Sequence, residues 1–103
     1  MLVARIMFEI EIRQAHGNHS VLIEKSEVIF GRKNEMSEVD VDLNPDASVS
    51  RVHARVWQSE AGIQIEDLGS SVGTIVNGDV LQAATVIQST DVIQLGETVV
   101  RVL

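Results

Sequence analysis

Apolar and polar residues alternate along most of the chain with the two-residue period of β-strands. In segment 5–13 every second residue from Ile6 to Ile12 is apolar, with acidic residues between the later ones. Such alternation is typical of a strand with one buried face. It returns in segments 52–57 and 63–67, whereas the 3.6-residue period of an amphipathic helix is found nowhere. The pattern predicts an all-β fold.

The expected strands are short and closely spaced. Ten of about eleven can be placed from the pattern, at 5–13, 21–23, 28–30, 41–43, 52–57, 63–67, 75–76, 80–81, 91–95 and 98–103. Turn-forming residues separate them, and the Asn77-Gly78 pair between two apolar runs is the strongest hairpin signal in the chain. Residues 16–19 are expected to form another turn. Many short strands at this spacing predict a sandwich of two packed sheets.

Segment 52–57 is expected to have a core face and an outer face. The core face would carry Val52, Ala54 and Val56, and the outer face His53, Arg55 and Trp57. We expect Trp57 to pack at the margin of the sandwich. An exposed indole that contacts a partner is the alternative.

The composition fits a single globular domain spanning residues 1–103. Hydrophobic residues make up 45% of the chain and charged residues 22%, and cysteine is absent, which excludes disulfides and thiolate metal sites. No apolar run reaches the roughly 20 residues of a membrane span, and no signal peptide opens the chain. We therefore expect a soluble, cytoplasmic protein that needs no cofactor or metal.

The charge balance narrows the class of partner. Fifteen Asp and Glu against eight Lys and Arg give a net charge of −7. An acidic protein of this kind is not expected to bind nucleic acids or anionic membranes, which require a basic face. A single phosphate group stays compatible with it, because salt screens charges more than about 8–10 Å away and a few local donors can dominate.

Four segments stand out in order along the chain: Gly31-Arg32, Ser50-Arg51-Val52-His53, Asp67 to Gly78, and Asp91 to Gly96. The first three carry residues suited to holding a phosphate. The guanidinium of Arg32 offers a planar fork of donors that matches phosphate oxygens, and Arg51 adds a second cation. Ser50 contributes a hydroxyl and a backbone N–H, and Ser71 supplies another hydroxyl from a separate loop. Loops that are distant in sequence can converge at one end of a sandwich.

In order and spacing these segments resemble the forkhead-associated (FHA) domain, over about the last three-quarters of the chain. The resemblance implies an FHA/SMAD-like β-sandwich that binds phosphothreonine and does no chemistry. It implies that Arg32, Ser50 and Ser71 contact the phosphate, often joined by Arg51. The expected partner is a Thr-phosphorylated protein or peptide that the domain recruits or regulates after a Ser/Thr kinase has acted. An apolar nook for the γ-methyl group would favour threonine over serine.

The resemblance also implies residues that support the site without touching the ligand. His53 would brace its loop from behind, and Asn77 with Gly78 would shape the later loop and hairpin. Gly31 lets the backbone turn tightly, and Gly73 belongs to the same supporting set.

One position departs from the family pattern. Where the family usually reads Asn-Gly-Thr, this chain reads Val72-Gly73-Thr74. In the family that Asn hydrogen-bonds the main chain of the bound peptide, and a valine side chain has no donor or acceptor. Val72 therefore predicts weaker peptide binding, or peptide contacts displaced toward side chains. It also favours the main alternative function, a phospho-independent interaction domain on the same fold.

Two chemical alternatives remain. Ser50, His53 and Asp67 are the residue types of a hydrolase triad, but no G-x-S-x-G segment accompanies the serine. We therefore expect no enzymatic activity. His16 and His19 are expected to be solvated turn residues, since no cysteine joins them in a metal site. A purely structural sandwich is the last alternative.

The organisation of the whole protein is open at this level. Because the chain stops within an expected strand, we expect it to be a domain excised from a longer signalling protein.

Overall fold

The computed structural model describes residues 6–103, which form eleven strands and no helix. The strands are β1 (Phe8–Gln14), β2 (Gly17–Ile23), β3 (Glu27–Gly31), β4 (Val41–Asp42), β5 (Ala54–Ser59), β6 (Gly62–Asp67), β7 (Thr74–Val76), β8 (Asp79–Val80), β9 (Thr85–Val86), β10 (Ile93–Leu95) and β11 (Thr98–Val102). Within this part of the chain, nothing has the length and apolar character of a membrane-spanning helix.

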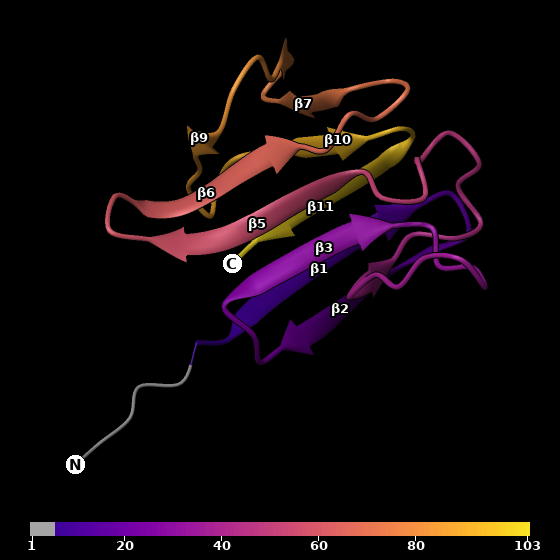
Figure 1. The fold of residues 1–103 in the computed structure, drawn as a ribbon, viewed down its shortest axis with the longest axis horizontal. Helices are drawn as coiled ribbons and strands as arrows, with labels where there is room; N and C mark the ends of the chain where they lie inside the picture. The colour runs from indigo at the N-terminus through magenta and orange to yellow at the C-terminus, as the bar shows by residue number, and fades with distance from the viewer. Residues whose placement is uncertain (1–5) are drawn as a thin grey trace.

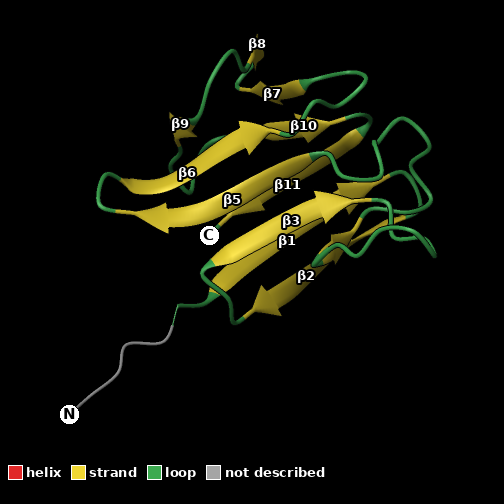
Figure 2. Ribbon diagram, in the orientation of Figure 1, coloured by secondary structure: helices red, strands yellow, loops and turns green. Residues whose placement is uncertain are grey.

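The strands form two sheets that pack face to face (Figures 1 and 2). The six-stranded sheet has the order β2-β1-β11-β10-β7-β8, and the five-stranded sheet has the order β4-β3-β5-β6-β9. β3 and β4 run parallel, whereas the strands that follow one another through tight turns, such as β1 and β2, are antiparallel. The predicted two-sheet β-sandwich of about eleven strands is confirmed.

The core lies between the sheets and is built from the inward-facing residues of both. In β1 the buried side chains are Phe8, Ile10 and Ile12, as the alternation predicts. Burying an apolar side chain of this size contributes about 1.5–3 kcal/mol. Leu43 and Val49 are also fully buried, although both lie in the loop between β4 and β5. The core therefore anchors this loop at two points and holds the chain between them in place.

Strand β5 begins only at Ala54, and the two residues before it depart from the predicted alternation. Val52 is 39% exposed, whereas His53 is fully buried. Alternation of faces holds only in extended backbone, and residues 51 and 52 lie in a bend. The prediction that Val52 faces the core and His53 the outer surface is therefore wrong, while Arg55 and Trp57 do lie on the outer face, half-buried.

Other boundaries shift by a few residues. β2 already begins at Gly17, so the turn after β1 consists of residues 15 and 16 rather than 16–19. The first expected strand started at residue 5, which lies outside the described residues, whereas β1 begins at Phe8. Ile6, which the alternation placed on the buried face, precedes the strand and is 37% exposed. β9 had no predicted counterpart, because its two residues are exposed and carry no alternation.

Trp57 packs against its neighbour on the outer face of the five-stranded sheet. The Arg55 guanidinium lies 4.1 Å from the centroid of the indole. Arg55 also donates from Nε to Glu66 at 2.5 Å and from Nη1 to Glu27 at 3.3 Å. A cation–π contact of this kind and two ion pairs fix both side chains on the sheet. A partner contact through Trp57 stays a prediction.

Most of the long loops lie at one end of the sandwich, at the right in Figure 1. This loop end consists of the β1–β2 turn, the loops on both sides of β4, the β6–β7 loop and the β10–β11 turn. Hydrogen bonds join them directly: the Arg32 N–H reaches the loop before β5, and the Glu97 N–H reaches Asp46. The β5–β6 turn at Glu60 lies at the opposite end.

Candidate functional site

The loop after β3 is tied to the loop before β5 at Arg32. The backbone N–H of Arg32 donates to the carbonyls of Ser50 and Arg51, at 3.2 and 3.1 Å. Gly31 makes this approach possible, because a Cβ at this position would overlap the carbonyl group of Arg51. A glycine is therefore required here for the close contact of two backbones.

His53 connects three segments from a fully buried position. Its Nδ1 accepts a hydrogen bond from the Ser50 N–H at 3.0 Å, so the ring proton lies on Nε2, which donates to the Gly73 carbonyl at 2.8 Å. The His53 N–H donates to Phe30 at 2.8 Å. The Ser50 N–H, which the sequence suggested as a ligand donor, is therefore already used within the protein.

A direct hydrogen bond joins Ser50 to Ser71, although 20 residues lie between them. The Ser71 N–H donates to Ser50 Oγ at 2.9 Å. Because Oγ is the acceptor in this bond, the Ser50 hydroxyl can still donate its own proton to another group. Ser50 is half-buried and Ser71 is exposed, so both hydroxyls lie where the loop end meets solvent.

Donors at this point of the surface lack partners of their own. Arg32 donates from Nε to the Val49 carbonyl, which fixes the plane of the guanidinium, and within residues 6–103 its two terminal nitrogens make no hydrogen bond. Arg51 is exposed, and no carboxylate of the described chain forms an ion pair with either arginine. The unneutralised guanidinium of Arg32 is thus held beside Val49 and Ser50, and the Ser50 hydroxyl is bonded to the loop that carries Ser71. Cationic and hydroxyl donors of this kind suit an anion.

A protein-family model for the FHA domain matches residues 28–96 of the chain. This range includes every loop described above except the β1–β2 turn and the end of the β10–β11 turn. The chain belongs to the FHA domain family. Nibrin of Danio rerio is 32% identical over 90 residues, which are 87% of this chain and 10% of that protein. The chain thus spans about a tenth of the length of this relative.

Solved FHA domains have the same architecture. The FHA domain of the CT664 protein from Chlamydia trachomatis is 26% identical, with a TM-score of 0.81 over 97% of each chain. A second structure comes from a study of phosphothreonine-dependent FHA domain interactions. It is 25% identical with a TM-score of 0.73, and the match covers 91% of this chain and 94% of that one. The similarity extends across both sheets and the loop end.

Val72 lies next to the converging hydroxyls of this FHA domain and is 50% exposed. It directly follows Ser71, and its side chain lines a hollow of about 200 Å³ together with Gly73 and Ile75. When a ligand covers an apolar side chain that has half of its surface in water, the free energy of binding becomes more favourable. Val72 therefore offers apolar contact where an amide would offer hydrogen bonds.

Asp67 organises the β6–β7 loop that carries Ser71. Its Oδ1 accepts from the hydroxyls of Ser70 at 2.5 Å and Thr74 at 2.8 Å, and its Oδ2 accepts from the N–H groups of Gly69 and Ser70 at 3.0 and 2.9 Å. Partial burial pushes the pKa of Asp67 upward, but the hydrogen bonds from Ser70 and Thr74 outweigh it and hold the pKa below its ordinary value.

The lowered pKa of Asp67 predicts a pH-dependent contribution to stability. A carboxyl whose pKa is lower in the folded state stabilises the fold above its unfolded pKa of about 3.9, and this contribution is lost as the pH falls through the folded pKa. We expect Asp67→Asn to lower the free energy of unfolding at pH 7 by about 1–3 kcal/mol. The difference from wild type should shrink below pH 4.

Chemical denaturation of both proteins between pH 7 and pH 3 measures this difference. Asp79→Asn, at an exposed position of β8, is the matched control and should show no loss at pH 7. A gap between wild type and Asp67→Asn that stays constant down to pH 3 would show that the ionised carboxylate is not what stabilises the loop.

Asn77 and Gly78 lie away from the converging hydroxyls, at the other end of β7. Both have positive φ, 50° and 88°, as the turn of the β7–β8 hairpin requires. The Asn77 side chain also donates to Asp91 at 2.8 Å and accepts from the Val92 N–H at 2.9 Å. These residues fix the hairpin to the loop before β10. A substitution of Asn77 or Gly78 could therefore affect the site only by moving β7, which follows the loop that carries Ser71.

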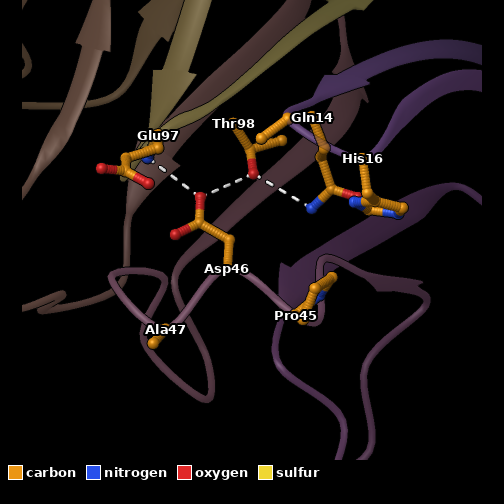
Figure 3. Close-up of a pocket in the computed structure, with 8 residues that line it drawn as sticks. Gln14, His16, Pro45, Asp46, Ala47, Glu97 and Thr98 are labelled. Carbon is orange, nitrogen blue, oxygen red and sulfur yellow. Dashed lines mark hydrogen bonds between the residues drawn. The ribbon is translucent and has the colours of Figure 1, made fainter.

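A second hollow of about 310 Å³ lies at the loop end beside β1 and β11, and Figure 3 shows its lining. Asp46 Oδ2 accepts from the Glu97 N–H at 2.9 Å and from the Thr98 hydroxyl at 2.7 Å. Gln14 Nε2 donates to the Thr98 hydroxyl at 3.1 Å. Burial raises the pKa of Asp46, but hydrogen bonds from Ser48, Thr98 and Glu97 outweigh it and hold the pKa below its ordinary value. Sequence motifs gave no sign of this network, which depends on contacts across more than 50 positions.

The geometry does not match a catalytic triad. His53 accepts from the backbone N–H of Ser50, not from its hydroxyl, and the Asp67 carboxylate accepts hydrogen bonds from Gly69, Ser70 and Thr74. In a triad the base would hold the serine hydroxyl and the acid would hold the base. Among the described residues there is also no cluster of three or more His, Asp or Glu side chains placed to hold a metal ion.

Proposed function

We propose that this FHA domain binds phosphothreonine-containing segments of partner proteins at its loop end. The observation that supports the proposal most is that Ser50 is hydrogen-bonded both to Arg32 and to Ser71, while the terminal guanidinium nitrogens of Arg32 lack partners within the described chain. A phosphorylated threonine carries a charge of about −1.5 to −2 at pH 7 and three strong acceptor oxygens. The terminal guanidinium nitrogens and the two hydroxyls are donors of the type that those oxygens accept.

The expected affinity is moderate. Each charge-assisted hydrogen bond contributes about 1.5–3 kcal/mol. Arg51 adds an electrostatic attraction to the phosphate, which salt weakens because Arg51 is exposed. After the entropic cost of association, three or four such bonds leave about −8 kcal/mol, a micromolar dissociation constant. Binding at this level suits recruitment that is switched by a Ser/Thr kinase and reversed by dephosphorylation.

Related domains support this role. One similar FHA domain was solved in a study of phosphothreonine-dependent FHA domain interactions. Another was solved in complex with the intracellular domain of Rv3910. We infer that the present domain lies within a longer cytoplasmic signalling protein, recognises a Thr-phosphorylated partner and brings the rest of its own chain to that partner.

Calorimetric titration with peptide pools tests the proposal. Three pools share degenerate flanks and differ at one central residue, which is phosphothreonine, phosphoserine or threonine. We expect micromolar binding of the phosphothreonine pool, weaker binding of phosphoserine and no detectable binding of threonine. Equal binding of the phosphorylated and unphosphorylated pools would refute phosphate recognition and establish the phospho-independent alternative, which the exposed apolar Val72 favours.

Val72→Asn tests the missing contact with the peptide backbone. An amide at this position can donate to and accept from the main chain of the ligand, which the valine cannot. One added hydrogen bond at about 0.5–1.5 kcal/mol predicts an affinity roughly two- to tenfold higher. The measurement is titration with one phosphothreonine peptide whose flanking residues are all alanine, and Val80→Asn in the β7–β8 hairpin is the control. Unchanged affinity of Val72→Asn would show that the peptide backbone does not approach this position.

A further inference from the structure

We propose that the apolar recess beside Val72 receives a lysine or arginine side chain of the bound phosphopeptide, and that the carboxylate of Glu97 pairs with its cationic end. This inference rests on the proposed function, because it concerns a residue near the phosphothreonine in the same ligand. It assigns Glu97 as the residue that sets the charge preference of the domain.

The recess adjoins the proposed phosphate site. Its lining consists of Ser48, Val72, Gly73, Ile75, Gly96 and Glu97, and its volume is about 200 Å³. Val72 directly follows Ser71, whose N–H is bonded to Ser50. An extended peptide advances about 3.3–3.6 Å per residue. A side chain within about three residues of the phosphothreonine can therefore reach the recess while the phosphate stays beside Ser50.

The position of Glu97 is fixed by its backbone. The Glu97 N–H donates to Asp46 Oδ2 at 2.9 Å and to Ser48 Oγ at 3.2 Å. Gly96 has φ of +62° and packs against Ser48 so closely that a larger residue would overlap it. The β10–β11 turn is therefore held against the loop before β5, and the Glu97 side chain leaves a rigid base.

The carboxylate itself is available. Glu97 is exposed, and within residues 6–103 its carboxylate forms no ion pair or hydrogen bond. In Figure 3 it points away from the side chains of Gln14 and His16, which lie across the neighbouring hollow. The hydrogen bonds that hold the turn use the backbone of Glu97 only, so its charge is not needed for them.

An apolar floor with an anionic rim matches one kind of side chain. Lysine and arginine lay their methylene stems along apolar surface and keep the charged end in water. Here Val72 and Ile75 would contact the stem, and Glu97 would meet the charge. An aliphatic residue would gain only the first contact, and an acidic residue would face repulsion from Glu97. The net charge of −7 also attracts peptides with basic residues on either side of the phosphothreonine.

Fluorescence anisotropy with phosphothreonine peptides tests the assignment. Lysine, norleucine, alanine or glutamate is placed singly at each of the four positions on either side of the phosphothreonine. Norleucine keeps the stem of lysine without its charge. At one position we expect lysine to bind about three- to fivefold more tightly than norleucine. In Glu97→Gln the ratio of the two affinities should fall to one, and in Glu97→Lys glutamate should become the preferred residue.

Glu60→Gln is the matched control, because Glu60 is exposed in the β5–β6 turn at the opposite end and its loss changes the net charge equally. The lysine advantage should persist in this variant, and in wild type it should shrink at high salt. Binding of phosphothreonine without a lysine advantage at any position, or with an advantage that Glu97→Gln retains, overturns this inference alone. No phosphate-dependent binding of any peptide overturns the proposed function and this inference together.

Discussion

Replacing Arg32 with alanine is expected to reduce the affinity for a phosphothreonine peptide by about a hundredfold, or below detection. Arg32 is half-buried and its Nε is held by the Val49 carbonyl, so its terminal nitrogens are oriented before the ligand arrives. Two charge-assisted hydrogen bonds at about 1.5 kcal/mol each amount to a factor of about 100 or more. Pre-orientation adds to this, because less side-chain entropy is lost on binding.

The matched control for this variant is Lys33→Ala. Lys33 is the next residue and is exposed, so the control removes the same charge from the same loop and keeps Arg32. We expect it to weaken binding less than about threefold, as exposed charges do. Titration calorimetry on both variants, with thermal unfolding to confirm that each is folded, makes the comparison. Equal losses in the two variants would show that only diffuse charge attracts the ligand and that Arg32 holds no phosphate.

Replacing His53 with alanine is expected to lower the free energy of unfolding by about 3 kcal/mol and to weaken binding even where the protein is folded. His53 is fully buried, so its truncation leaves a cavity. It also leaves the Ser50 N–H and the Gly73 carbonyl without their partner at Nδ1 and Nε2, and each unpaired group costs about 1–3 kcal/mol. The loops that carry Ser50 and Ser71 then lose the side chain that connects them.

His16→Ala is the control for histidine truncation, since His16 is exposed in the β1–β2 turn. Urea unfolding should show no loss of stability in this variant and a reduced midpoint with an unchanged slope in His53→Ala. For a domain of this size a loss of 3 kcal/mol corresponds to a fall in Tm of more than about 10 °C. A stable His53→Ala variant with wild-type affinity would contradict the positioning role of His53.

Much of the fold follows from local sequence patterns. Alternation alone located β1 and its buried face, because extended backbone turns every second side chain to the same side. The Asn77-Gly78 turn was equally predictable, since both residues tolerate the positive φ that the hairpin requires. The pattern failed where the backbone is bent: Val52 and His53 exchange their predicted environments because the strand begins two residues later, at Ala54.

The candidate site was predictable in its residue types and not in its connections. Arg32, Ser50 and Ser71 could be selected by their side-chain chemistry, but the hydrogen bond from Ser71 to Ser50 and the use of the Ser50 N–H by His53 depend on how two loops meet. The role of Glu97 was invisible for the same reason. Its position depends on Asp46 and Ser48, about 50 residues earlier in the chain.

The most direct test of the account is an NMR titration of the ¹⁵N-labelled domain with a phosphothreonine peptide. We expect the largest chemical-shift changes at the Arg32 Nε–H and at the amides of Ser50, Arg51, Ser71 and Val72, with no change at the Trp57 indole N–H on the outer face. The unphosphorylated peptide should cause none of these changes. Phosphate recognition at the loop end would be contradicted if the phosphorylated peptide left the loop end unchanged, or if the shifts clustered around Trp57.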